Sequence, residues 1–245
     1  MKKFTKIMLV TAGIMTSIGV FCMVIAFALG FTGNKFVEMF EDNKFSFGFV
    51  DYDEENDGAI PIDEECKNLD IEFGAGTLEI YYDDVEQIQL EKYNMAAYKI
   101  YVENETLHID GDTKVTNNSD ITLTIILPQK TVFQKVEMDL GASEASIDQL
   151  VADTFEIEVG AGEANIYSLD IKNLDAEVGV GRLAIEMNGK QTDYNYHIEC
   201  GIGEIQIGDY SYGGFGAEQK IKNENASKQM NVACGIGEID IEFME

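Results

Sequence analysis

Acidic side chains recur at fixed places in a repeated pattern, and they are the residues of this chain that could do chemistry. Six segments alternate apolar and acidic residues and then reach a Gly-x-Gly motif or a close variant of it. In five of them a carboxylate stands two residues before the first Gly: Glu72, Asp139, Glu158, Glu177 and Glu199. The sixth segment has Ala233 there. Because crowded carboxylates repel one another and Ca²⁺ prefers oxygen ligands, these five acids are candidate ligands for Ca²⁺.

A second column lies four residues before the same Gly. It holds Asp70, Glu137, Glu156, Asp175, His197 and Asn231. Both columns are in the outward phase of the alternation, so segments stacked at ~4.8 Å would form a ladder of acids two residues wide. The alternative is a solvated surface with no specific ligand, because strand alternation alone produces paired acids.

The spacing of the glycines indicates the elements that position these acids. Gly141, Gly160 and Gly179 are 19 residues apart, the next gap is 22 residues and the last is 34. Apolar residues recur at every second position before the motif, which is the period of a strand with one buried face. After the second Gly the alternation slips by one residue, which requires a bulge or a tight corner.

Each unit is therefore predicted to be a strand, a Gly-x-Gly corner and a second strand. One unit cannot bury its own apolar face, whereas stacked units bury a shared core. The sequence predicts an all-β domain over residues 67–245, a β-solenoid or β-helix-like stack of repeats of ~19 residues. The departures from the repeat are predicted to be four strands and an inserted loop: 85–90, 98–102, 106–109, 121–127 and the loop 208–228.

The N-terminal region is predicted to anchor the domain in a membrane. Residues 7–31 are 25 consecutive residues without a charge, long enough to span a hydrocarbon core of ~30 Å. Lysines within residues 1–6 place that tail in the cytoplasm and the remainder outside the cell, with 32–66 as a juxtamembrane linker. A cleaved signal peptide is the alternative, since Ala26-Phe27-Ala28 resembles a cleavage site. Either reading exports the domain.

Composition limits the partners. Forty-five acids against 17 bases give a net charge of −28, which argues against binding nucleic acid and suits cations, basic partners or simple solubility. The cysteines, Cys22, Cys66, Cys200 and Cys234, follow no zinc-site spacing. Cys200 and Cys234 occupy the inward column and are expected to be core residues.

Nothing in the motifs indicates catalysis. The chain has two histidines and lacks a Gly-x-Ser-x-Gly elbow, a P-loop and a His-Glu-x-x-His motif. The Gly-x-Gly motifs precede no predicted helix, so they are not phosphate-binding loops. We therefore expect no catalytic residue, no cofactor other than Ca²⁺, and no enzymatic activity.

The chain resembles the bacterial putative adhesin family from Lys67 to Glu245. The resemblance rests on the repeated Gly-x-Gly units, on the strand 121–127 closed by Leu127-Pro128, and on the N-terminal anchor. It implies a β-solenoid-like fold in an extracytoplasmic domain, and it implies no catalytic or binding residues.

Three functions are open on the sequence. The first is a non-catalytic cell-surface domain, held in the lipid bilayer by residues 7–31, for adhesion, envelope interaction or envelope-stress signalling through an envelope or protein partner. The second is a cation- or polysaccharide-binding domain. The third is a polysaccharide-active enzyme, suggested by paired carboxylates on a solenoid.

Overall fold

The computed structural model describes residues 60–95, 98–111 and 121–244. The predicted cytoplasmic tail, the predicted membrane helix 7–31 and most of the predicted linker 32–66 lie outside the described residues. Among the residues that are described, no helix has the length and apolar character needed to cross a membrane.

Strands dominate the described residues, and the predicted all-β class is confirmed. A single short 3-10 turn, Gln191–Asp193, precedes one of them. The strands, in chain order, are β1 Ile60–Ile62, β2 Asn68–Asp83, β3 Ile88–Tyr93, β4 Lys99–Glu103, β5 Thr106–Gly111, β6 Thr122–Pro128, β7 Phe133–Ile147, β8 Leu150–Asp170, β9 Asn173–Asn188, β10 Tyr194–Ile207, β11 Tyr210–Ile221 and β12 Lys228–Met244.

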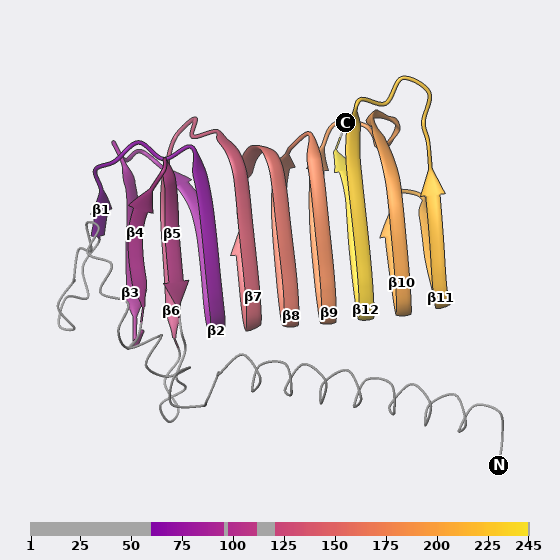
Figure 1. The fold of residues 1–245 in the computed structure, drawn as a ribbon, viewed down its shortest axis with the longest axis horizontal. Helices are drawn as coiled ribbons and strands as arrows, with labels where there is room; N and C mark the ends of the chain where they lie inside the picture. Colours follow the sequence, from indigo (N-terminus) through magenta and orange to yellow (C-terminus); the bar gives the residue numbers. More distant parts are fainter. Residues whose placement is uncertain (1–59, 96–97, 112–120, 245) are drawn as a thin grey trace, which may run out of the picture. The chain divides into compact units, whose positions relative to one another are not determined.

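The strands form one large mixed sheet (Figure 1). Its order is β1-β3-β6-β2-β7-β8-β9-β12-β10-β11, and β5 pairs with both β2 and β4. The six repeats are β2, β7, β8, β9, β12 and β10, and each is parallel to the repeats beside it. Antiparallel pairs occur where β1, β3, β4 and β11 join the sheet.

Each repeat is one long strand that bends and returns, so the sheet has two arms (Figure 1). In β10 the buried residues are Tyr194, Tyr196, Ile198 and Cys200 before the motif, and Ile205 and Ile207 after it. The buried phase therefore slips by one residue at Gly-x-Gly, as the sequence predicts. Apolar side chains from both arms pack into one core.

The segment between the first two repeats supplies another level of the sheet in two pieces. β5 pairs in parallel with the first arm of β2, and β6 pairs in parallel with its second arm. The four strands predicted here correspond to β3, β4, β5 and β6, although β3 begins at Ile88 rather than at residue 85. β1 lies within the range assigned to the linker and pairs with β3.

Two features differ from the sequence-based expectation. The inserted loop predicted at 208–228 is wrong over Tyr210–Ile221, which forms β11 and pairs with β10 because the Gly-rich chain turns straight back after Ile207. The repeats also do not stack in chain order, since β12 lies between β9 and β10. This order brings Cys200 and Cys234 directly opposite each other, and both are buried free thiols, which confirms their core placement.

The backbones of successive repeats approach one another closely at the corner. A Cβ added to Gly181 would lie 1.9 Å from the carbonyl oxygen of Gly162 on the neighbouring strand. Gly181 also has a φ of +149°, a conformation that L-residues with a side chain rarely adopt. Glycine is needed here for both space and conformation.

Gly181→Ala is predicted to destabilise the domain strongly. A methyl group at 1.9 Å from a backbone oxygen forces the two strands apart, at a cost of about 3 kcal/mol or more. Thermal unfolding of the full chain would measure it. The matched control is Gly213→Ala, where the added Cβ would lie 3.4 Å from its nearest neighbour. Equal melting temperatures for the two variants would contradict the close packing at the corner.

Candidate functional site

The register of the sheet aligns the predicted acids in one continuous row on the first arm. We call this the acidic row. In sheet order its members are Asp110, Glu72, Asp139, Glu158, Glu177, Ala233, Glu199 and Glu218. All five candidate acids named from the sequence are in it. Asp110 of β5 and Glu218 of β11 extend it at the two ends.

A second row runs beside the first, two residues earlier on the repeat strands. We call this the mixed row. In sheet order its members are His108, Asp70, Glu137, Glu156, Asp175, Asn231, His197 and Lys220. Both histidines of the chain therefore lie at the flanks of a run of acids. The row changes from acidic in its middle to basic or neutral toward β11.

Crowding is greatest where the acidic row crosses β5, β2 and β7. Glu72, Asp110, Asp139 and Glu158 line an open hollow of about 490 Å³ against the corner. Partial burial and the charge of Asp110 raise the pKa of the Glu72 carboxyl. Partial burial and the charge of Glu137 likewise raise the pKa of Asp139. The hollow therefore favours a proton or another cation over bare carboxylates.

Elsewhere the chain offsets the repulsion with specific neighbours. Lys135 Nζ lies 2.8 Å from both Glu137 and Glu156, so one lysine serves two neighbouring acids of the mixed row. Because β12 lies between β9 and β10, the uncharged Ala233 separates Glu177 from Glu199. Stacking in chain order would have put those two carboxylates on adjacent strands.

The second arm carries a shorter acidic row that is interrupted by an arginine. Its central members in sheet order are Glu144, Glu163, Arg182, Glu238 and Glu204. Arg182, the single arginine of the chain, lies 3.4 Å from Glu163 and 3.8 Å from Glu238. The guanidinium thus neutralises acids on the strands at both sides of its own.

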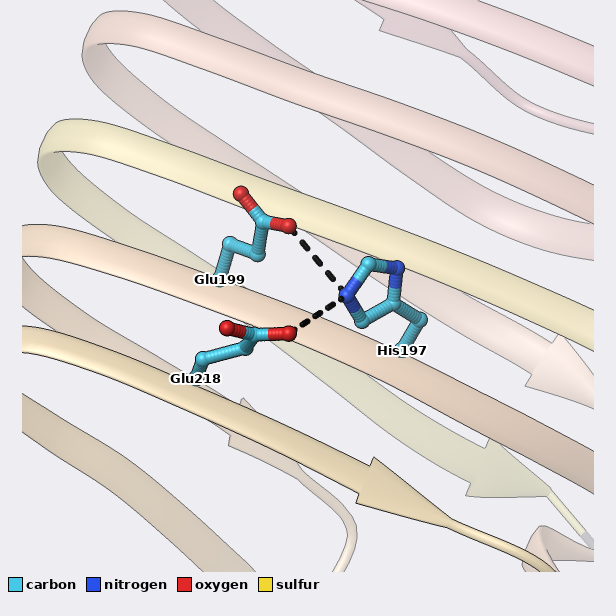
Figure 2. Close-up of side chains that lie close together, drawn as sticks. All are labelled: His197, Glu199 and Glu218. Carbon is cyan, nitrogen blue, oxygen red and sulfur yellow. Dashed lines mark ion pairs between the residues drawn. The ribbon is translucent and has the colours of Figure 1, made fainter.

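Among the described residues, one group of side chains has the composition and spacing of a metal site. It consists of His197 and Glu199 on β10 and Glu218 on β11, and its three candidate ligand atoms lie within 4.8 Å of one another. Figure 2 shows both carboxylates directed toward the same nitrogen of the imidazole. His197 and Glu199 share a face because they are two residues apart on a strand, and Glu218 is the cross-strand partner of Glu199.

Glu218 lies close to two groups that can carry a positive charge, His197 and Lys220. His197 Nε2 lies 3.2 Å from Glu199 Oε1 and 3.5 Å from Glu218 Oε1. Lys220 Nζ lies 2.9 Å from the same Glu218 oxygen. Lys220, with a smaller contribution from His197, lowers the pKa of Glu218. The Glu218 carboxylate is therefore held ionised beside the imidazole.

Sequence reasoning found part of this group. Glu199 is among the five predicted ligands, and His197 belongs to the predicted second column. Glu218 was missed because it lies in the segment predicted to be a loop. A signal existed in the alternation of Glu218 and Lys220, but its cross-strand partner follows only from the antiparallel pairing of β11.

The fold and the rows define an all-β repeat domain with bent strands. The chain matches the family described as the N-terminal domain of toast_rack, DUF2154, over residues 49–208, and it belongs to that family. Solved structures of bacterial putative adhesins, the family that the sequence resembles, match the chain as well. No curated protein matches the chain.

Two of these solved structures illustrate the likeness. The chain is similar to a "putative cell adhesion protein" from Clostridium sporogenes, with 18% identity and a TM-score of 0.49, over 76% of this chain and 98% of that one. It is also similar to a "putative adhesin" from Bacteroides fragilis, with 13% identity and a TM-score of 0.36, over 75% of this chain and 95% of that one.

Glu72→Gln is predicted to stabilise the domain near neutral pH. Since folding raises the pKa of Glu72, the folded state loses stability as the pH rises above the ordinary value of 4.5, and the amide removes that loss. The expected gain is about 0.5 kcal/mol, or a rise of ~1–2 °C in Tm at pH 7.5. The gain should shrink toward pH 5, and thermal unfolding at both pH values measures it.

Glu86→Gln is the control, because Glu86 is an exposed acid between β2 and β3. A gain at Glu86 equal to that at Glu72 would show that only the net charge matters.

Arg182→Gln is predicted to destabilise the domain in a salt-dependent way. The change leaves Glu163 and Glu238 without the guanidinium between them, at a cost of about 0.5–1 kcal/mol at low ionic strength. Screening should reduce the loss at ~0.5 M salt. Lys130→Gln makes the same charge change in the turn after β6, and an equally large, equally salt-dependent loss there would refute a specific role for Arg182.

Proposed function

We propose that this chain is a non-catalytic cell-surface module that binds a positively charged envelope partner through the acidic row of its first arm. The apolar segment 7–31 would hold it in the lipid bilayer, with the β domain outside the cell. In this proposal the bent, parallel repeats form a β-solenoid-like body that carries the binding surface.

The observation that carries the proposal is the alignment of the acids. Seven carboxylates fall in one row across eight strands, with only Ala233 uncharged. Such a row on a rigid sheet attracts a partner whose positive charges are spread along a line. Anionic polymers and nucleic acids are poor candidates for the same surface, because the charge would repel them.

The arrangement also favours binding over catalysis. The hollow along Glu72 and Asp139 is open to solvent, whereas catalytic acids work in sites that exclude water and separate their pKa values. His108 Nδ1 forms a hydrogen bond of 2.8 Å with Asp70 Oδ2. The His108 ring also stacks on the Tyr101 ring, with the ring centroids 4.7 Å apart. The repeat geometry accounts for these groups without a reaction.

The proposal predicts that loss of the acidic row weakens binding in a salt-dependent manner. The full chain in nanodiscs of zwitterionic lipid would be tested for retention of solubilised envelope proteins at low and high salt. Combining Glu72→Gln, Asp139→Asn and Glu158→Gln should weaken retention of a salt-eluted partner about tenfold, at ~0.5 kcal/mol for each charge.

The matched control removes three exposed acids from loops: Glu86→Gln, Asp209→Asn and Glu224→Gln. Equal retention by both triple variants would refute a role for the acidic row.

Incubation of the wild-type chain with cell-wall glycans tests the other part of the proposal. New reducing ends or unsaturated sugars in that assay would refute a non-catalytic module.

A further inference from the structure

The group His197, Glu199 and Glu218 has a geometry that hydrogen bonding does not explain. His197 Nε2 is shielded from solvent, yet it makes no hydrogen bond of acceptable geometry. Two carboxylate oxygens nevertheless face it at 3.2 Å and 3.5 Å (Figure 2). Two carboxylates that converge on one imidazole nitrogen need a positive charge between them, which either a proton on Nε2 or a bound metal ion can supply.

The separations fit a tetrahedral zinc ion. Zinc lies ~2.0–2.1 Å from a histidine nitrogen and ~2.0–2.2 Å from a carboxylate oxygen. At the tetrahedral angle those bond lengths place ligand atoms about 3.4 Å apart. The two distances from Nε2 to the carboxylate oxygens lie on either side of that value. Both carboxylate oxygens therefore lie from Nε2 at separations typical of two zinc ligands, and all three candidate ligand atoms lie within 4.8 Å of one another.

The chemistry of the ligand set selects the metal. Imidazole suits Zn²⁺ and related transition ions, whereas Ca²⁺ prefers a shell made of oxygen atoms alone. Two carboxylates and one neutral imidazole would balance the charge of a divalent ion. Lys220, which now lies 2.9 Å from Glu218 Oε1, is long and exposed, so it can move aside when a divalent cation takes its place.

His108 provides an internal comparison. It also lies in the mixed row and pairs with a carboxylate, Asp70, at 2.8 Å. That pair is a direct contact through Nδ1 of a ring stacked on Tyr101, and it belongs to no group of three ligand atoms in the described residues. The two histidines of the chain thus differ in whether a second carboxylate converges on the ring nitrogen.

We propose that His197, Glu199 and Glu218 bind one Zn²⁺ ion, with the fourth position open to water or to a ligand atom from a partner. Because the ligands come from both β10 and β11, the ion would join the last strand of the sheet to the repeat beside it. The site goes beyond the proposed function and does not depend on it, since the triple variant of the acidic row leaves all three ligands intact.

The test uses the metal-free full chain in nanodiscs and two probes, Zn²⁺ by calorimetry and Co²⁺ by visible absorption. About 5 mM Ca²⁺ is present throughout to occupy weak, oxygen-only sites on the acidic rows. We expect saturation at one ion per chain and a tetrahedral Co²⁺ spectrum. With zinc at ~100 times its Kd, Tm should rise by about 5 °C or more.

Variants assign the site. His197→Gln and Glu218→Gln should each weaken zinc binding at least tenfold and abolish the tetrahedral cobalt spectrum, while far-UV circular dichroism stays unchanged. His108→Gln removes the other histidine and should bind as the wild type does. The proposal is overturned by either of two results: no saturable zinc binding in the presence of Ca²⁺, or equal affinities for wild type and His197→Gln.

Discussion

The backbones of neighbouring repeats approach so closely at the Gly-x-Gly corner that the rest of the molecule follows from that contact. A carbonyl oxygen of one strand occupies the space that a Cβ of the next would need, as between Gly162 and Gly181. Strands that fit together there cannot shift in register. Every residue at a given distance from the corner therefore falls into a row, with apolar rows inside and charged rows outside.

The rows explain how a chain of net charge −28 keeps a compact sheet. Burial of one Ile or Leu contributes about 1.5–3 kcal/mol, whereas a pair of like charges on adjacent strands costs about 0.2–1 kcal/mol. Each repeat buries more apolar side chains than the number of acids that it adds to the rows. The core outweighs the repulsion, and Lys135, Arg182 and Ala233 reduce it at the places described above.

The sequence predicted the repeat, the buried phase and the slip at the corner, because all three depend on local spacing. It also placed Cys200 and Cys234 in the core. It did not predict that β12 lies between β9 and β10. The stretches Cys200–Ile207 and Cys234–Ile241 differ at a single position, so the repeat motif itself does not distinguish their places in the sheet.

The strand β11 escaped prediction for a different reason. Its Gly-rich sequence lacks the apolar–acidic alternation of the repeats, and its conformation depends on pairing with β10. The group around His197 depends both on local spacing along β10 and on the pairing of β11 with β10. Its members on β10 were visible in the columns, whereas Glu218 joined them only through that antiparallel pairing.

The antiparallel strands at both flanks have a consequence for assembly. A stack of parallel repeats is open-ended, because its last strand offers the next copy the same surface that it received itself. Here β11 runs against β10, and β3 and β4 run against β6 and β5, so the direction of the chain reverses next to the parallel strands at each flank, and the three-residue β1 then pairs antiparallel with β3. A second molecule that pairs with these strands cannot continue the stack of parallel repeats by simple translation along the sheet. In the described residues, continued parallel stacking of repeats on β11 or β4 is therefore disfavoured.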